Sequence, residues 1–367
     1  MKLVFDKNKL VEATNIVMKA VPVHTTMPIL ECILIDASGM DIRLTANDTE
    51  LGIETVVEGE IKESGRIAID AKIFSNIVHK LPDAAVTITT DENLLAVITC
   101  GKSRFNIPGK DPDDYSPLPA VDKDDFITIS QYSLREIIRQ TIFSIAVNEN
   151  NKIMTGELFE IRSNTLRVVS LDGHRIAMRM LALNNPAEDK KVVVPGKTLS
   201  EVAKIVTGGM DDPVDIFFSR NHMMFEFGST RVVTSLIDGE YFAIDQMLST
   251  DYDTKVVVNN SEFQDCIDRS SLLIRDADKV PVLIDIDDTE MHLHIDSPMG
   301  SMNESVDIDK AGKDIRIGFN PKFLLDALRV IDDENVTLYF MNSKAPCFIR
   351  DDEGTYVYLV LPVNINV

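Results

Sequence analysis

Two short segments contain residue types that could support catalysis. Asp172 and His174 could act as an acid–base pair or bind a metal, and Gly196, Lys197 and Thr198 look like part of a phosphate-binding loop. However, the chain has only six histidines, no His-x-x-x-His pair and no dense carboxylate cluster beside a glycine-rich loop. The Gly-Lys-Thr segment also lacks the upstream glycine of a Walker loop. We therefore expect no catalytic residue, no metal and no cofactor.

The four cysteines are too scattered to suggest a metal site or a disulfide framework. They are Cys32, Cys100, Cys266 and Cys347, and no Cys-x-x-Cys pair occurs. Such spacing is typical of reduced thiols in or near a core.

Basic side chains recur at helical spacing, and this pattern suggests a different chemistry. Lys197 and Lys204 share the polar face of a predicted helix whose other face has Leu199, Val202 and Val206. Carboxylates are interspersed with the basic residues, and aromatic stacking residues are absent. This combination favours weak, sequence-independent attraction to phosphate over base reading. A solvated helix face has a similar composition, so the argument depends on repetition along the chain. The basic positions are Lys9, Lys19, Lys72, Lys80, Arg135, Arg139, Lys197, Lys204, Lys322 and Arg329.

The helices that would position these cations belong to a repeat that occurs six times. An apolar strand is followed by a capping or turn residue and an amphipathic helix, and the helices open near residues 6, 70, 130, 195, 259 and 320. About three strands with alternating apolar and polar residues follow each helix. One such unit is small for independent stability, so two units per domain are expected. Acidic, turn-rich stretches mark the boundaries and give domains of residues 1–121, 122–250 and 251–367. We predict an α+β fold in which each domain has two helices backed by antiparallel sheets.

The composition limits the class of protein. The 367 residues are 44% apolar, and no apolar run is long enough for a membrane span. The first residues lack the apolar segment of a secretory signal, so a cytoplasmic protein is expected. The net charge of −22 argues against nucleic acid, but five of the six predicted helices have one more basic than acidic residue. The helices would therefore form a mildly basic face on an acidic protein.

Simple geometry relates six helices per chain to duplex DNA. Helices pack about 8–10 Å apart, so a ring of six leaves an opening of roughly 10 Å. A ring of twelve leaves about 25–30 Å, which admits a duplex of roughly 20 Å. Only a dimer supplies twelve helices, and a closed head-to-tail ring also leaves no unpaired sheet edge.

Specific segments then show a resemblance to a known family. The chain resembles the bacterial sliding clamps, the beta subunits of DNA polymerase III, over essentially its full length. The matching segments are residues 26–30 (TMPIL), 44–50 (LTANDTE), 103–107 (SRFNI), 170–176 (SLDGHRI), 237–241 (IDGEY) and 358–363 (YLVLPV). The resemblance implies three repeated clamp domains in a pseudo-sixfold, head-to-tail dimeric ring. It also implies a non-catalytic processivity factor that encircles duplex DNA topologically and tethers the replicative polymerase. Other implied partners are the clamp loader and further proteins with a clamp-binding motif.

The resemblance also implies particular site residues. The wall of a partner-peptide pocket would comprise Met154, Leu171, Asp172, Gly173, His174, Arg175, Ile176, Met247, Leu359, Val360, Leu361, Pro362 and Val363. Ring closure would bury Phe105 and Ile107 of one chain against Leu272 and Leu273, placed in the fifth helix, of the other. His24 and Asn148 would join the basic residues on the DNA-facing surface.

This sequence departs from the family pattern in ways that affect the pocket. Phe242 stands where a proline is common, and the usual C-terminal Arg-Leu appears as Asn364 and Ile365 with two further residues. Two other classes of protein stay open from the residues alone, namely an acidic β-rich enzyme and a scaffold that binds only proteins.

Overall fold

The computed structural model describes residues 1–147, 151–274 and 280–364, and their contacts divide the chain into two compact units. The first unit comprises residues 1–134 and 201–236, and the second comprises residues 135–200 and 237–367. The proposed three-domain division stays a prediction.

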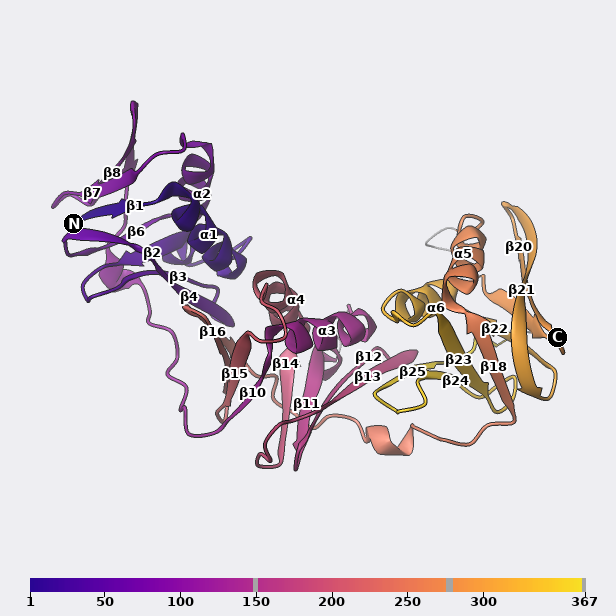
Figure 1. The fold of residues 1–367 in the computed structure, drawn as a ribbon. Helices are drawn as coiled ribbons and strands as arrows, with labels where there is room; N and C mark the ends of the chain where they lie inside the picture. The colour runs from indigo at the N-terminus through magenta and orange to yellow at the C-terminus, as the bar shows by residue number, and fades with distance from the viewer. Residues whose placement is uncertain (148–150, 275–279, 365–367) are drawn as a thin grey trace. The chain divides into compact units, whose positions relative to one another are not determined.

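All six predicted helices are present, each directly after a strand (Figure 1). Their bounds are α1 Lys7–Val17, α2 Ala71–Lys80, α3 Gln131–Thr141, α4 Gly196–Ile205, α5 Asn260–Ser271 and α6 Pro321–Leu328. Side-chain oxygens cap the amino ends of α1, α2, α5 and α6, as the sequence predicted. In α1 the Asp6 carboxylate accepts hydrogen bonds from the backbone N–H of Asn8 and Lys9, and Asn259 and Asn320 cap α5 and α6 in the same way.

The first unit contains two antiparallel sheets. The five-stranded sheet has the order β5-β1-β7-β8-β9, and the eight-stranded sheet has the order β10-β15-β16-β17-β4-β3-β2-β6. The bounds are β1 Lys2–Phe5, β2 Cys32–Asp36, β3 Ile42–Asn47, β4 Leu51–Val57, β5 Gly59–Glu63, β6 Arg66–Asp70, β7 Val86–Thr90, β8 Leu95–Cys100, β9 Ser103–Pro108, β10 Phe126–Ser130, β15 Pro213–Phe218, β16 His222–Phe227 and β17 Thr230–Ser235. Helices α1 and α2 pack together, and α1 also packs on β3 and β4.

The second unit is built on one continuous sheet of twelve strands. Its order is β14-β11-β12-β13-β25-β24-β23-β18-β21-β20-β19-β22. The bounds are β11 Gly156–Arg162, β12 Thr165–Leu171, β13 Arg175–Ala182, β14 Lys190–Pro195, β18 Thr254–Asn259, β19 Val282–Ile286, β20 Glu290–Ser297, β21 Gly300–Gly312, β22 Ile315–Phe319, β23 Asn335–Phe340, β24 Cys347–Arg350 and β25 Tyr356–Val360. Strands β13 and β25, far apart in sequence, pair antiparallel. This pairing joins the strands that follow α3 to those that follow α6.

The two faces of this sheet have separate apolar clusters, because successive side chains on a strand alternate between faces. Tyr358 and Val360 of β25 belong to the large cluster under α5 and α6. Leu359, between them, belongs to a smaller cluster on the other face, together with Leu171 and Ile176. Two helices backed by antiparallel strands are therefore confirmed as the basic unit of the fold.

Other expectations concern the thiols and the membrane. All four cysteines are buried and free, and their burial confirms the predicted place in or near a core. Across the described residues, every helix is too short or too polar to span a membrane.

Candidate functional site

An apolar pocket of about 350 Å³ opens on the face of the second unit that Leu359 occupies. A single row of paired residues, Leu171 on β12, Ile176 on β13 and Leu359 on β25, forms its floor. Apart from Gly173 and Arg175, every lining side chain is apolar. The full lining is Met154, Leu171, Gly173, Arg175, Ile176, Phe242, Met247, Pro346, Leu359 and Leu361. Met247 and Leu361 are exposed, so the pocket presents apolar surface to solvent.

The turn between β12 and β13, residues 172–175, forms one rim of the pocket. The Asp172 carboxylate accepts hydrogen bonds from the backbone N–H of His174 at 3.0 Å and of Arg175 at 3.2 Å. Gly173 has φ = 87°, a conformation that side chains with a Cβ rarely adopt. The carbonyl oxygen of His174 accepts a hydrogen bond from the N–H of Leu361, which ties the chain after β25 to this turn. Asp172 thus organises the turn, and these hydrogen bonds give it a structural role.

Arg175 fixes the turn to the interior of the unit. Its side chain is only 7% exposed, and its guanidinium forms ion pairs with Asp172 at 3.0 Å and Asp326 at 2.7 Å. It also donates to the carbonyl oxygen of Phe143 and lies over the rings of Phe143 and Phe323. A buried guanidinium needs such partners to offset the loss of hydration. All of these partners come from this unit, so Arg175 holds one side of the pocket rigidly.

The structure brings together eight of the thirteen residues predicted for this wall. Asp172, His174, Val360, Pro362 and Val363 do not line the pocket. Val360 faces the opposite core because it follows Leu359 on the same strand. The backbone N–H of Val363 bonds to the carbonyl oxygen of Gly318, which directs the chain along β22. Phe242 and Pro346 line the pocket and were missing from the predicted wall, although the sequence had marked Phe242 as a departure at the rim.

The predicted cations lie on or next to the helices, but many have a carboxylate partner. Lys9 pairs with Glu58, Lys204 with Glu201 at 2.7 Å, and Lys322 with Asp326 at 3.2 Å. Arg329 pairs with Asp268 at 2.7 Å across α6 and α5. These carboxylates neutralise part of the positive charge that the sequence placed on the helices.

Two of the cations share a hollow of the first unit. A depression of about 830 Å³ is lined by α1, the end of α4 and the β16–β17 turn. Lys19, in the turn after α1, and Lys204, at the end of α4, both line it. The other polar residues around it are Asn8, Glu12, Asn15, Ser75, Gln131, Thr207, Ser229 and Thr230.

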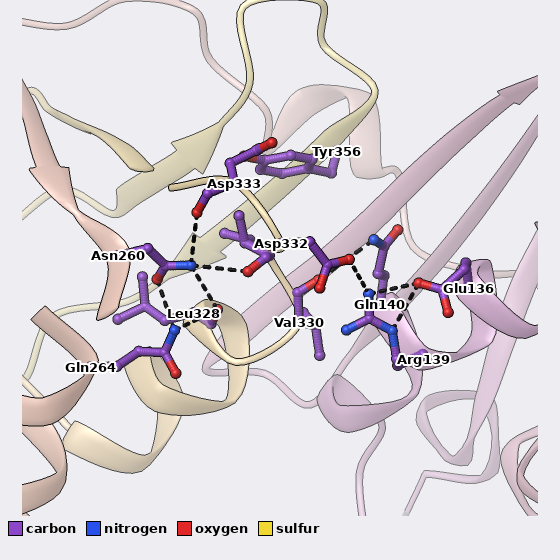
Figure 2. A network of polar contacts seen from close by, with 11 residues as sticks. Glu136, Arg139, Gln140, Asn260, Gln264, Leu328, Val330, Asp332, Asp333 and Tyr356 are labelled. Carbon is purple, nitrogen blue, oxygen red and sulfur yellow. Dashed lines mark hydrogen bonds and ion pairs between the residues drawn. The ribbon is translucent and has the colours of Figure 1, made fainter. Parts of the chain in front are cut away.

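Arg139 forms ion pairs with two carboxylates, one of them far away in the sequence, which its helical spacing did not predict. Figure 2 shows its guanidinium between Glu136, one turn earlier on α3, and Asp332, beyond α6, each at 2.6 Å. Nearby, the buried Asn260 donates from its side-chain amide to the carbonyl oxygens of Leu328, Ile331 and Asp333 (Figure 2). Arg139 therefore links two segments of the second unit. It is half-buried and is less available to an external phosphate than Lys72 or Lys80, which are exposed on α2.

Known proteins similar to the chain cover nearly all of its length. Models of the DNA polymerase III beta subunit match residues 1–119 (N-terminal domain), 128–242 (central domain) and 245–364 (C-terminal domain). The chain belongs to the beta sliding clamp family. As a member of this family it is a non-catalytic processivity subunit of the DNA polymerase III holoenzyme. The sequence resemblance is thereby confirmed.

Individual relatives agree with this assignment. The beta sliding clamps of Staphylococcus epidermidis and Staphylococcus aureus are 34% and 35% identical to the chain, and each alignment covers 99% of both proteins. A crystal structure from Eubacterium rectale, assigned to the DNA polymerase III beta subunit, is 61% identical with a TM-score of 0.97, and all of both chains is covered. The DNA polymerase sliding clamp of Bacillus subtilis is 33% identical with a TM-score of 0.96, and 100% of this chain and 99% of that chain are covered.

The residues predicted for ring closure have different exposures in the chain. Phe105 on β9, the edge of the five-stranded sheet, is 39% exposed, whereas Ile107 is buried in its own unit. Leu272 is 73% exposed, and Leu273 packs against the large core cluster. Both leucines follow α5, which ends at Ser271, so their placement within the fifth helix was wrong. The sequence missed this end because the apolar pattern continues through the leucines.

His24 lies exposed in the loop after α1, and Asn148 lies outside the described residues. Among the described residues, no group of three or more His, Cys, Asp or Glu side chains could hold a metal ion.

Proposed function

We propose that two copies of the chain join head to tail into a ring that encircles duplex DNA without reading its sequence. The ring would tether the replicative polymerase, the clamp loader and other proteins with a clamp-binding motif through the apolar pocket. Family membership supports the role, and the pocket is the observation that supports this mode of tethering. Repeated clamp domains of residues 1–121, 122–250 and 251–367 would form the ring in the cytoplasm.

The chemistry of the pocket suits a short apolar segment of a partner. The Leu171–Ile176–Leu359 row is a fixed strand surface, whereas Met247 and Leu361 are exposed side chains at the opening. Leucine and methionine side chains adapt to different apolar partners, and burial in a preformed cleft avoids an ordering cost in the protein. Met154 and Phe242 add further apolar lining. An extended peptide with two or three large apolar side chains is the occupant that fits.

A pair of variants separates pocket binding from folding. Leu361→Asp places a charge at the opening, in an exposed side chain that the core does not need, and should weaken binding of a peptide from the replicative polymerase at least about ten-fold. The matched control is Met40→Asp, which changes a nearly fully exposed methionine in the turn between β2 and β3. This variant should bind the peptide as the wild type does. Fluorescence anisotropy of the labelled peptide measures both. Equal affinity of Leu361→Asp and wild type would contradict the pocket assignment.

The exposed Leu272 and Phe105 are the surface residues that support a ring. A leucine that is 73% exposed has its apolar area available to a second copy. Sedimentation should give twice 40.9 kDa for the wild type and a lower weight-average mass for Leu272→Asp. Loaded wild-type protein should stay on circular duplex and leave the same duplex once it is linearised. Release from both forms at one rate would exclude topological encirclement.

The DNA-facing surface would comprise the helix cations with His24 and Asn148. Lys19 and Lys204 in their shared depression, and the exposed Lys72 and Lys80, are the positions best placed to attract phosphates. Such contacts position a duplex without specifying sequence.

A further inference from the structure

Helix α6 contributes both to the predicted DNA-facing surface and to the support of the pocket. Its polar face has Lys322, which is 71% exposed, and Asp326, which is mostly buried. The same carboxylate oxygen of Asp326 accepts from the Lys322 ammonium at 3.2 Å and from the Arg175 guanidinium at 2.7 Å. A cation that faces solvent and a cation that lines the pocket therefore share one acceptor atom.

The connection continues from Arg175 to the pocket rim. The Nε of Arg175 donates to one oxygen of Asp172 at 3.0 Å, and the other oxygen of Asp172 caps the 172–175 turn. Phe323, the next residue after Lys322, lies 4.6 Å from the Arg175 guanidinium and stacks on His174 at 5.8 Å. Helix α6 thus contacts the pocket turn through a charged pair and through a ring. Every residue of this path lies in the second unit.

We propose that Lys322, Asp326 and Arg175 couple the binding of a DNA phosphate to the affinity of the pocket for a partner peptide. This inference rests on the proposed function and specifies how one of its sites regulates the other. A phosphate near α6 competes with Asp326 for the Lys322 ammonium. Once Lys322 turns to the phosphate, the shared Asp326 oxygen accepts a hydrogen bond from Arg175 alone. The hydrogen bond from Arg175 to Asp326 then strengthens, because the competing donor is gone.

The consequence for the pocket follows from Arg175. A firmer hold on Arg175 restrains Asp172 and the 172–175 turn in the geometry that lines the pocket. The turn then loses less conformational freedom when a peptide binds, and the free energy of binding becomes more favourable. The clamp on DNA should therefore bind its partner more tightly than the free clamp. Because solvent screens the Lys322 ammonium, which is 71% exposed, its pair with Asp326 is weak and the coupling is expected to be modest, roughly two- to five-fold. Linkage requires that the peptide raise the affinity for DNA by the same factor.

The test measures the anisotropy of a labelled polymerase peptide against the full-length protein, free or loaded to saturation on a small circular duplex. Duplex should lower the peptide dissociation constant of the wild type by roughly two- to five-fold. Lys322→Ala should show no duplex effect, and without duplex it should already bind about as tightly as wild type with duplex. Lys72→Ala removes one cation of the same predicted surface but has no contact with the path, so it should retain the full duplex effect. A titration of labelled duplex shows that each variant is saturated.

The outcomes distinguish the coupling from the function on which it rests. An equal duplex effect in Lys322→Ala and wild type overturns the path through Asp326. Peptide and duplex that each bind, with no influence on one another in the wild type, overturn the coupling and leave the proposed function intact. Absence of peptide binding or of duplex binding overturns both.

Discussion

The charged groups behind the peptide pocket and those on the predicted DNA-facing helices differ in how firmly the fold holds them. Arg175 is almost fully buried, and each of its three guanidinium nitrogens donates a hydrogen bond within its own unit. Arg329 and Lys204 form one ion pair each and remain exposed. A partner peptide requires a fixed shape, whereas a sliding duplex requires attraction without fixed geometry. The difference in burial therefore matches the difference in the proposed ligands.

The largest test of this contrast removes one arginine from each region. Arg175→Ala would leave Asp172, Asp326 and the Phe143 carbonyl without their buried partner, and should reduce the free energy of unfolding by about 3–5 kcal/mol. Arg329→Ala removes a solvent-exposed pair with Asp268 and should cost less than about 1 kcal/mol. Urea titrations monitored by circular dichroism measure both. Similar losses in the two variants would mean that burial does not distinguish the regions.

A second test concerns a buried carboxyl beside the same core. Glu157 on β11 is fully buried, and no hydrogen bond from the described residues reaches either of its carboxyl oxygens. The nearby Thr141 hydroxyl donates to the carbonyl oxygen of Ile137 instead. Burial raises the pKa of Glu157 from 4.5 to about 8, so the carboxyl is protonated in the folded protein at neutral pH.

The sign of the resulting pH dependence follows from that raised pKa. Between about pH 4.5 and 8 the folded state binds a proton that the unfolded state has lost, so Glu157 lowers stability as pH rises through this window. Glu157→Gln removes this term. Its unfolding free energy relative to wild type should therefore increase by up to roughly 1.4 kcal/mol for each pH unit. Urea titrations at several pH values measure the difference, and a difference that does not vary with pH would show that Glu157 has a partner or reaches solvent.

The smallest expected effect compares cations within the helix surface. The double variant Lys72→Ala and Lys80→Ala removes two exposed ammonium groups for which the described residues show no ion pair. Its slope of log affinity for duplex DNA against log salt should flatten by up to about 0.9 per lost contact. Lys204→Ala should change this slope by less than the loss of one unpaired cation does, because Glu201 already neutralises part of the Lys204 charge. A larger change for Lys204→Ala would indicate that the carboxylate pairs open completely on DNA.

Several elements were predictable because they depend on local chemistry. Asp6, Asp70, Asn259 and Asn320 were predicted at the helix openings, and each caps a helix in the structure. Period-two patterns correctly gave antiparallel strands after each helix. The end of α5 was harder, since a helical apolar pattern does not distinguish a last turn from the residues after it. The sequence could have shown that Val360 does not line the pocket. Successive side chains on β25 alternate between faces, so Val360 points away from the pocket if Leu359 lines it.

The sequence by itself determined the sixfold repeat, the capped helices, the paired strands and the family resemblance, since each depends on residues close together in the chain or on their order. Only the tertiary structure decided which side chains share a space. The pairing of β13 with β25 sets Leu171, Ile176 and Leu359 in one row, although residues 176 and 359 are far apart in sequence. It also brings Asp326 to Arg175, and Asp332 to Arg139. Periodicity cannot specify such meetings, because they depend on how distant strands pair and on which charged groups burial forces together.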